Sequence, residues 1–207
     1  MGSALIRKKG ISPRQLQRTL GVGMKTAWHM GHRIRLAMAT SADAGPIGGE
    51  GKTVEADEAY LAKSPKTRKS GEKHARTEPV VLSLVERGGA IRSMFLDDKN
   101  VRSALVQHLD DRSRLVTDGS TVYKGQSEKH ESVDHSKYEW ARGDVHTNSI
   151  ESFWSQVKRG INGTYVWVSK KHLQLYLREF EYRHNLRRQP ALMFELLLQA
   201  FPKVRVE

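Results

Sequence analysis

The sequence has no cysteine, few aromatic residues and no long apolar run. The absence of cysteine excludes disulfide bonds and zinc sites built on thiolates. A membrane-spanning helix needs roughly 20 consecutive apolar residues, and no segment of this chain approaches that length. The N-terminal residues are polar and basic, which does not fit a secretory signal peptide. These absences predict a protein of the cytoplasm without membrane spans.

Acidic residues are also scarce, because 23 Asp and Glu stand against 35 Lys and Arg. The formal net charge of +12 indicates a polyanionic partner, and nucleic acid is the common one. A soluble basic protein without such a partner is the alternative. The chain has 207 residues, of which 38% are hydrophobic. That is enough for one core of ordinary size and a small appended module.

Residues 11–39 show a helical pattern that is interrupted by a glycine turn. Ser12 is suited to cap the first helix, and Pro13 suits its first position. A Gly-Val-Gly turn at 21–23 leads to a second helix with basic ends. This order is typical of a helix-turn-helix, although an ordinary helical hairpin gives the same pattern. We therefore interpret residues 1–40 as a helix-turn-helix-like DNA-binding segment. Its candidate DNA contacts are Lys25, Thr26, His29 and Arg33.

The middle of the chain is predicted to form strands and its end to form helices. Residues 41–51 are rich in Gly, Ala and Ser and predict a linker. Expected strands are 53–61, 79–85, 90–96, 115–117 and 131–134, and expected helices are 101–109, 148–160, 169–186 and 190–200. The second and third strands should pair as a hairpin around a Gly-Gly turn. The basic loop at 63–76 either contacts DNA backbone or is simply solvated. The order predicts an α/β fold with a mixed sheet flanked by helices.

Two aspartates stand on or at the end of expected strands. Asp57 shares a strand face with Glu55, whereas Glu58 points the other way. Acids on a buried strand are costly unless a cation compensates them, although an exposed strand end would also tolerate them. Asp118 follows an apolar strand, where ligands of α/β sheets often bind, but an Asp-Gly turn is the simpler interpretation. The acids at 97–98 are better explained as turn or capping residues.

The expected helix at 148–160 carries a glutamate and a lysine on one face. Glu151 and Lys158 are seven residues apart, which is two helical turns. An apolar stripe beside them would pack on the sheet. The carboxylate would then be available to a metal ion and the lysine to a phosphate. A plain amphipathic helix with solvated charges is the alternative. Three carboxylates suffice for Mg²⁺ (or Mn²⁺), which prefers oxygen ligands and supports phosphodiester hydrolysis.

Four segments carry a family resemblance. They are V-E-A-D-E-A-Y at 54–60, V-T-D-G-S at 116–120, H-T-N-S-I-E-S-F-W-S-Q-V-K-R-G-I-N-G-T-Y at 146–165 and K-H-L-Q-L-Y-L-R-E-F-E-Y-R-H-N-L-R at 171–187. Together they resemble the DDE transposases of bacterial insertion sequences, and most closely the ISXO2-like subgroup. The resemblance covers residues 11–188, and its third segment is highly specific.

The resemblance implies an RNase H-like catalytic domain at 52–188, followed by a C-terminal helix and tail at 189–207. It implies that a D-D-E triad binds divalent metal and that the lysine of the third segment joins the active site. The triad is Asp57, Asp118 and Glu151, and the lysine is Lys158. Some relatives use a different third residue, for which Asn148 is the candidate. Lys158 and Arg159 would also contact DNA.

The function implied by the resemblance is metal-dependent phosphodiester hydrolysis and strand transfer during DNA transposition. The partners would be double-stranded transposon ends and target DNA, bound by a homo-oligomer in the bacterial nucleoid. Relatives usually have an N-terminal zinc-binding region, so this cysteine-free chain is expected to be a truncated copy. The alternative is a truncated, non-catalytic DNA-binding relic. A single-strand transposase is disfavoured, because His29 and His32 are separated by two residues instead of one.

Overall fold

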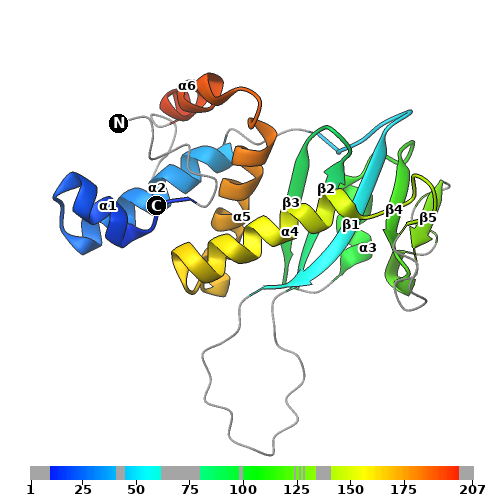
Figure 1. Cartoon of the computed structure of the whole chain (residues 1–207), viewed down its shortest axis with the longest axis horizontal. Coiled ribbons are helices and arrows are strands. Elements are labelled where there is room, and N and C mark those ends of the chain that lie inside the picture. Colours follow the sequence, from blue (N-terminus) through cyan, green and yellow to red (C-terminus); the bar gives the residue numbers. More distant parts are fainter. Residues whose placement is uncertain are drawn as a thin grey trace, which may run out of the picture.

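The computed structural model of the chain describes residues 10–40, 45–61, 80–97, 100–123, 129–133 and 141–200, with Gly125 and Ser127. These residues form a mixed five-stranded sheet with helices on both faces and a further group of helices beside it (Figure 1). The predicted α/β class with a mixed sheet flanked by helices is therefore confirmed. No helix in these ranges combines the length and apolar character that a membrane crossing requires.

The sheet has the strand order β3-β2-β1-β4-β5. Its strands are β1 (Thr53–Tyr60), β2 (Val80–Glu86), β3 (Ile91–Leu96), β4 (Arg114–Asp118) and β5 (His130–Val133). The first three form an antiparallel meander, in which β2 and β3 pair as the predicted hairpin. In contrast, β4 runs parallel to β1, and β5 runs parallel to β4. The parallel pairs bring the carboxyl ends of β1 and β4 to the same end of the sheet.

Two apolar layers hold helices on the two faces of this sheet. On one face, Ala59 and Val81 pack with α4 (Asn148–Gly160) and α5 (Lys170–Asn185). On the other face, Val54 and Ala56 pack with α3 (Val101–His108) and the short helix η1 (Thr121–Tyr123). Alternation along β1 thus sends odd-numbered residues toward α4 and even-numbered residues toward α3. Asp57 therefore shares the α4 face with Glu55, as the sequence predicts.

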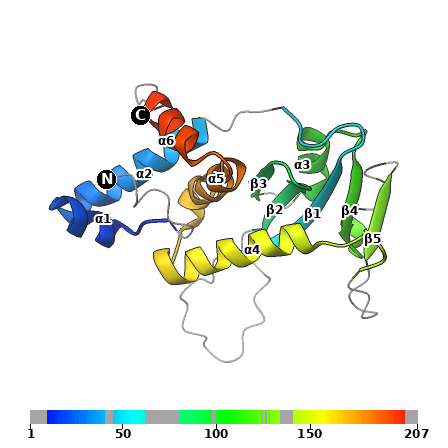
Figure 2. The same cartoon turned by 45° about the horizontal axis from the view of Figure 1, so that its top comes forward.

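The remaining helices form a group beside the sheet, as both views show (Figure 2). They are α1 (Pro13–Leu20), α2 (Met24–Thr40) and α6 (Pro190–Ala200). The Ser12 hydroxyl oxygen accepts a hydrogen bond from the Gln15 amide at 3.2 Å, and Pro13 opens α1, so both predicted roles are confirmed. Gly21 ends α1 with φ 66°, a conformation that glycine adopts without strain.

The helix group is joined to the sheet layer through α5. Arg35 of α2 is buried, and its Nε donates to Glu179 Oε2 of α5 at 2.8 Å. The guanidinium carbon of Arg35 also lies 4.0 Å from the centroid of the Tyr176 ring. An apolar cluster of α2, α5 and α6 adds Ala37, Tyr182 and Leu197. These contacts make α5 the shared support of both parts.

Most predicted elements agree with the structure within one or two residues. The expected strand at 131–134 begins one residue earlier, at His130. The sequence did not predict the π-helix η3 (Ile161–Tyr165), which extends α4. In the predicted linker, Ile47 is buried and forms a β-bridge with Leu109. The predicted basic loop at 63–76 lies outside the described residues.

Candidate active site

Asp57 and Asp118 lie on neighbouring parallel strands at the same level of the sheet. The register pairs Ala56 with Thr117, so each aspartate is the next residue on its strand. Burial raises the pKa of Asp57 to about 7, and the charges of Asp118 and Glu58 add to this rise. Lys158 acts in the opposite direction on the same carboxyl group. The tertiary structure therefore brings two predicted site carboxylates and the predicted lysine within electrostatic reach of one another.

Glu58 is a third acid at this end of the sheet, on the face opposite to Asp57. The buried Tyr123 hydroxyl donates a hydrogen bond to Glu58 Oε2. Burial raises the pKa of Glu58, and the charge of Asp118 raises it further. Burial also raises the pKa of Tyr123, so this phenol remains a donor. Sequence reasoning gave neither residue a role, although three acids within four residues of β1 were a signal.

Glu151 lies on the exposed side of α4, near the helix start. Thr147 is buried, and its hydroxyl donates to Glu151 Oε1 at 2.7 Å. Asn148, Ser155 and Lys158 are also exposed, which matches the predicted polar stripe. Within the described residues, no three His, Asp or Glu side chains gather closely enough to hold one metal ion. Asp57 and Asp118 thus lie next to each other, whereas the Glu151 side chain is hydrogen-bonded to Thr147.

Glu55 fixes the start of α4 against β1. Its side chain is fully buried, and its Oε2 accepts hydrogen bonds from the Ser149 amide at 2.8 Å and the Ile150 amide at 3.0 Å. The Ser149 hydroxyl donates to Oε1 at 3.0 Å, and Arg87 Nε donates to the same oxygen at 2.8 Å. A carboxylate at a helix N-terminus also interacts favourably with the helix dipole. Glu151 directly follows the residue that Glu55 binds, and Asp57 is the next residue of β1 on that face.

The predicted DNA-contacting residues of α2 have mostly open side chains. Lys25, Thr26 and His29 are exposed, and Arg33 is half-buried. The two candidates on α4, Lys158 and Arg159, are both exposed, and Arg159 Nε donates to the Ser155 carbonyl at 3.1 Å. The N-terminal half of α2 therefore presents its basic residues to solvent.

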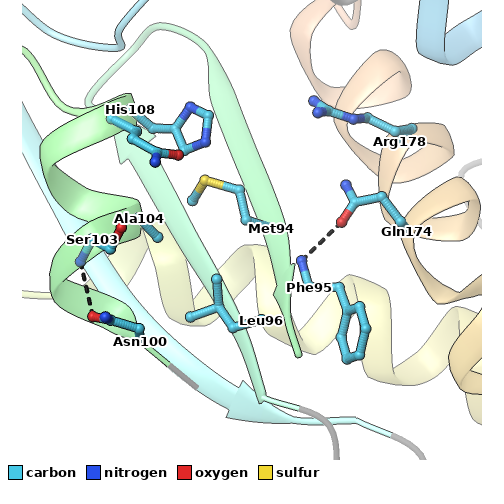
Figure 3. Close-up of a pocket in the computed structure, with 10 residues that line it drawn as sticks. Met94, Phe95, Leu96, Asn100, Ser103, Ala104, His108, Gln174 and Arg178 are labelled. Atoms are coloured by element: carbon cyan, nitrogen blue, oxygen red, sulfur yellow. Dashed lines mark hydrogen bonds between the residues drawn. The ribbon is translucent and has the colours of Figure 1, made fainter. Parts of the chain in front are cut away.

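A cavity of about 340 Å³ lies away from the acids, between β3, α3 and α5 (Figure 3). His108 and Ser103 of α3 line one side of it, and Gln174 and Arg178 of α5 line the other. None of the sequence-predicted site residues lines this cavity. Its floor is the edge strand β3, whose Phe95 amide donates to Gln174 Oε1 at 2.8 Å.

The chain is similar to known proteins of transposable elements. The profile of the ISXO2-like transposase domain matches residues 48–185. An uncharacterized protein in transposable element ISH50 of Halobacterium salinarum is 28% identical over 201 residues. That alignment covers 87% of this chain and 66% of the relative, so the chain spans just under two thirds of the relative's length. No solved structure matches the chain.

Proposed function

Because this chain belongs to the ISXO2-like transposase domain family, we propose that it cuts and joins DNA during transposition of an insertion sequence. The reactions would be metal-dependent phosphodiester hydrolysis at a transposon end and transfer of the released 3′ strand end to target DNA. The observation that carries the proposal is the adjacency of Asp57 and Asp118, which lie at the same level of β1 and β4, with Asp118 at the carboxyl end of β4. Ligands of open α/β sheets commonly bind at such strand ends.

Asp57, Asp118 and Glu151 would hold Mg²⁺ or Mn²⁺. The raised pKa of Asp57 supports this assignment, because burial and the charges of Asp118 and Glu58 disfavour the ionised form of Asp57 until a cation compensates them. When bound, two such ions activate water and neutralise phosphate charge. Lys158 would meet a phosphate, and Glu151 would exchange its Thr147 hydrogen bond for the metal. Asn148 is the alternative third residue, since it lies one turn before Glu151 on the same helix face.

We also assign the sheet domain at 52–188 to the RNase H-like class. The support is its antiparallel meander with two parallel strands added beside β1. Residues 1–40 would be the helix-turn-helix segment, 41–51 a linker, and 189–207 a C-terminal helix and tail. Lys25, Thr26, His29 and Arg33 would face the DNA groove, because the N-terminal half of α2 is open to solvent. A homo-oligomer in the bacterial nucleoid would bind the two transposon ends.

The test is nicking of supercoiled plasmid DNA by the purified chain in Mg²⁺ or Mn²⁺. Asp57→Asn, Asp118→Asn and Glu151→Gln should each lower the nicking rate by more than about a hundredfold, since loss of a metal ligand should exceed the roughly 10–100-fold loss that is typical for a hydrogen-bond partner of a ligand. Asp97→Asn is the matched control, because the Asp97 side chain is 84% exposed and lies outside the site. If Asp118→Asn nicked DNA at the parental rate, the triad assignment would be wrong.

A non-catalytic DNA-binding relic is the second candidate function. The observation in its favour is the Glu151 side chain, which bonds Thr147 instead of joining the two aspartates. Calorimetric titration with Mn²⁺ separates the two functions. Saturable Mn²⁺ binding that Asp57→Asn abolishes would support the enzyme, and DNA binding without any metal binding would support the relic.

A further inference from the structure

Two neighbouring apolar side chains project into solvent between η3 and α5. Val166 is 77% exposed and Trp167 is 52% exposed, and we call this pair the 166–167 tip. The residues on either side of it are anchored, because Tyr165 and Val168 are both buried in the α4–α5 core. The Tyr165 hydroxyl also donates to Glu179 Oε2 at 2.9 Å. A large aromatic ring is therefore held out in water on a fixed base.

The backbone of the tip is in a conformation that valine rarely adopts. Val166 has φ 65° and ψ −45°, and the Trp167 amide donates to the Tyr165 carbonyl at 2.7 Å. This is a γ-turn with positive φ at its centre, which is a rare and strained form. Within the described residues, Val166 is the only non-glycine residue with positive φ. Strain of this kind persists where the surrounding structure imposes it, and it is common at functional sites.

The chain on either side of the tip is basic, although Lys170 Nζ lies 3.3 Å from Asp97 Oδ1. From Lys158 to His172 the chain has four Lys or Arg residues and no acid. The His172 ring packs edge-on against Trp28 of α2, with 5.5 Å between centroids. The start of α5 thus adjoins the open half of α2, which also carries Lys25. In both views the end of α4 and the start of α5 lie on the side of α2, beyond the β3 edge of the sheet (Figures 1 and 2).

We propose that the 166–167 tip is a DNA wedge, in which Trp167 stacks on an unpaired or unstacked base. An aromatic ring stacks on a base of any identity, and flanking cations hold the adjacent phosphates. Apolar side chains that enter a base step unstack it and kink the duplex. The γ-turn fixes the backbone that carries the ring before DNA arrives, which lowers the entropy lost on binding. This inference rests on the proposed function, because it assumes that the chain binds DNA.

The experiment compares two duplexes of arbitrary sequence at one salt concentration. One duplex carries a single unpaired 2-aminopurine, and the other is fully paired. The parent chain should bind the first duplex more tightly and quench the fluorescence of its 2-aminopurine. Trp167→Ala should bind that duplex about tenfold more weakly, which is within the range of base–aromatic stacking. Its affinity for the paired duplex should fall less, because the free energy needed to unstack a paired base offsets part of the stacking gain there.

Two further variants control this experiment. Trp167→Phe keeps an aromatic ring and should retain most of the preference for the unpaired base. Phe194→Ala removes another exposed aromatic ring, which is 46% exposed on α6, and should bind both duplexes as the parent does.

Each contrary outcome has a separate meaning. If the parent binds DNA but Trp167→Ala keeps the full preference, the wedge is refuted and the proposed function stands. The wedge is likewise refuted if Trp167→Ala changes only the oligomeric state of the chain, since the tip is then a protein contact. If the parent binds neither duplex, the proposed function fails, and the wedge fails with it.

Discussion

At the scale of single residues, the start of α4 depends on how Glu55 is paired. Its carboxylate oxygens accept hydrogen bonds from Arg87, from the Ser149 amide and hydroxyl and from the Ile150 amide. Arg87 in turn donates to the carbonyls of Asp144 and His146, which precede the helix. One buried carboxylate thus joins β1 to the helix that carries Glu151. A divalent-metal site at Asp57 would need this junction in place.

Removal of the Glu55 carboxylate should destabilise the fold strongly. Glu55→Ala leaves Arg87 without its carboxylate and two helix amides without acceptors, so we expect a loss of about 3–5 kcal/mol in the free energy of unfolding. Denaturant-induced unfolding measures it. Asp97→Ala is the control, because the side chains of Asp97 and its partner Lys170 are 84% and 55% exposed, and such surface pairs contribute about 0–1 kcal/mol. Equal losses for the two variants would contradict the role of Glu55.

At the scale of elements, α5 completes the sheet edge through its polar side chains. Gln174 accepts from the Phe95 amide and donates to the Ser93 carbonyl, so it takes the place of a neighbouring strand. Asn185 forms the same pair of bonds with the amide and carbonyl of Ile91. Glu181 accepts from the Ser93 amide between them. Coverage of an open edge in this way prevents pairing with another chain.

His184 near the end of α5 should make stability depend on pH. Burial lowers the pKa of His184 to about 4, and the charge of Arg187 lowers it further. Because the unfolded chain binds this proton near pH 6.5, it holds more protons than the folded chain between the two values. Stability from this group is therefore present above pH 6.5 and is lost as pH falls toward 4.

The measurement is urea unfolding of the parent and His184→Gln at several pH values in this range. His32, whose pKa burial also lowers to about 4, contributes to the slope of both proteins. The difference between the two proteins therefore isolates His184. The variant should lose less stability on acidification than the parent, and parallel curves would contradict the prediction.

At the scale of the whole molecule, one buried ionic cluster joins the helix group to α5, which packs on the sheet. Glu179 of α5 accepts hydrogen bonds from Arg35 of α2, from Tyr165 and from Arg183. Burial alone would raise the pKa of Glu179, but Arg35, Arg183 and the Tyr165 hydroxyl outweigh it and hold that pKa below its usual value. The base of the 166–167 tip belongs to the same cluster through Tyr165.

Disruption of this cluster should lower the local stability of α2 more than that of the sheet. Glu179→Ala leaves two buried guanidinium groups without their carboxylate, and breaking a buried pair costs about 3–5 kcal/mol. Hydrogen exchange should accelerate most in α2 and η3 and least in β1 and β2. Lys171→Ala, an exposed position on the same helix, should leave all four elements as protected as in the parent. Uniform acceleration across the sheet would contradict this order.

The sequence alone determined most of the local structure and indicated the family. Hydrophobic periodicity, the Ser12–Pro13 start and the glycine turns set most element boundaries, because these signals act over a few residues. The acids of β1, Asp118 and the helix with Glu151 were visible for the same reason, and the family resemblance is the basis on which we propose a shared role for them.

Only the tertiary structure decided which of these residues meet. Parallel pairing of β1 with β4 placed Asp57 beside Asp118, and no local pattern specifies which strands pair. The bonds from α5 to the sheet edge, from Glu55 to α4 and from Arg35 to Glu179 join residues that are 79, 94 and 144 positions apart. Such contacts depend on burial, which exists only after the chain has folded. The strained turn at Val166 also depends on tertiary contacts. The packing of Tyr165 and Val168 on either side holds the Val166 backbone in this unfavourable conformation.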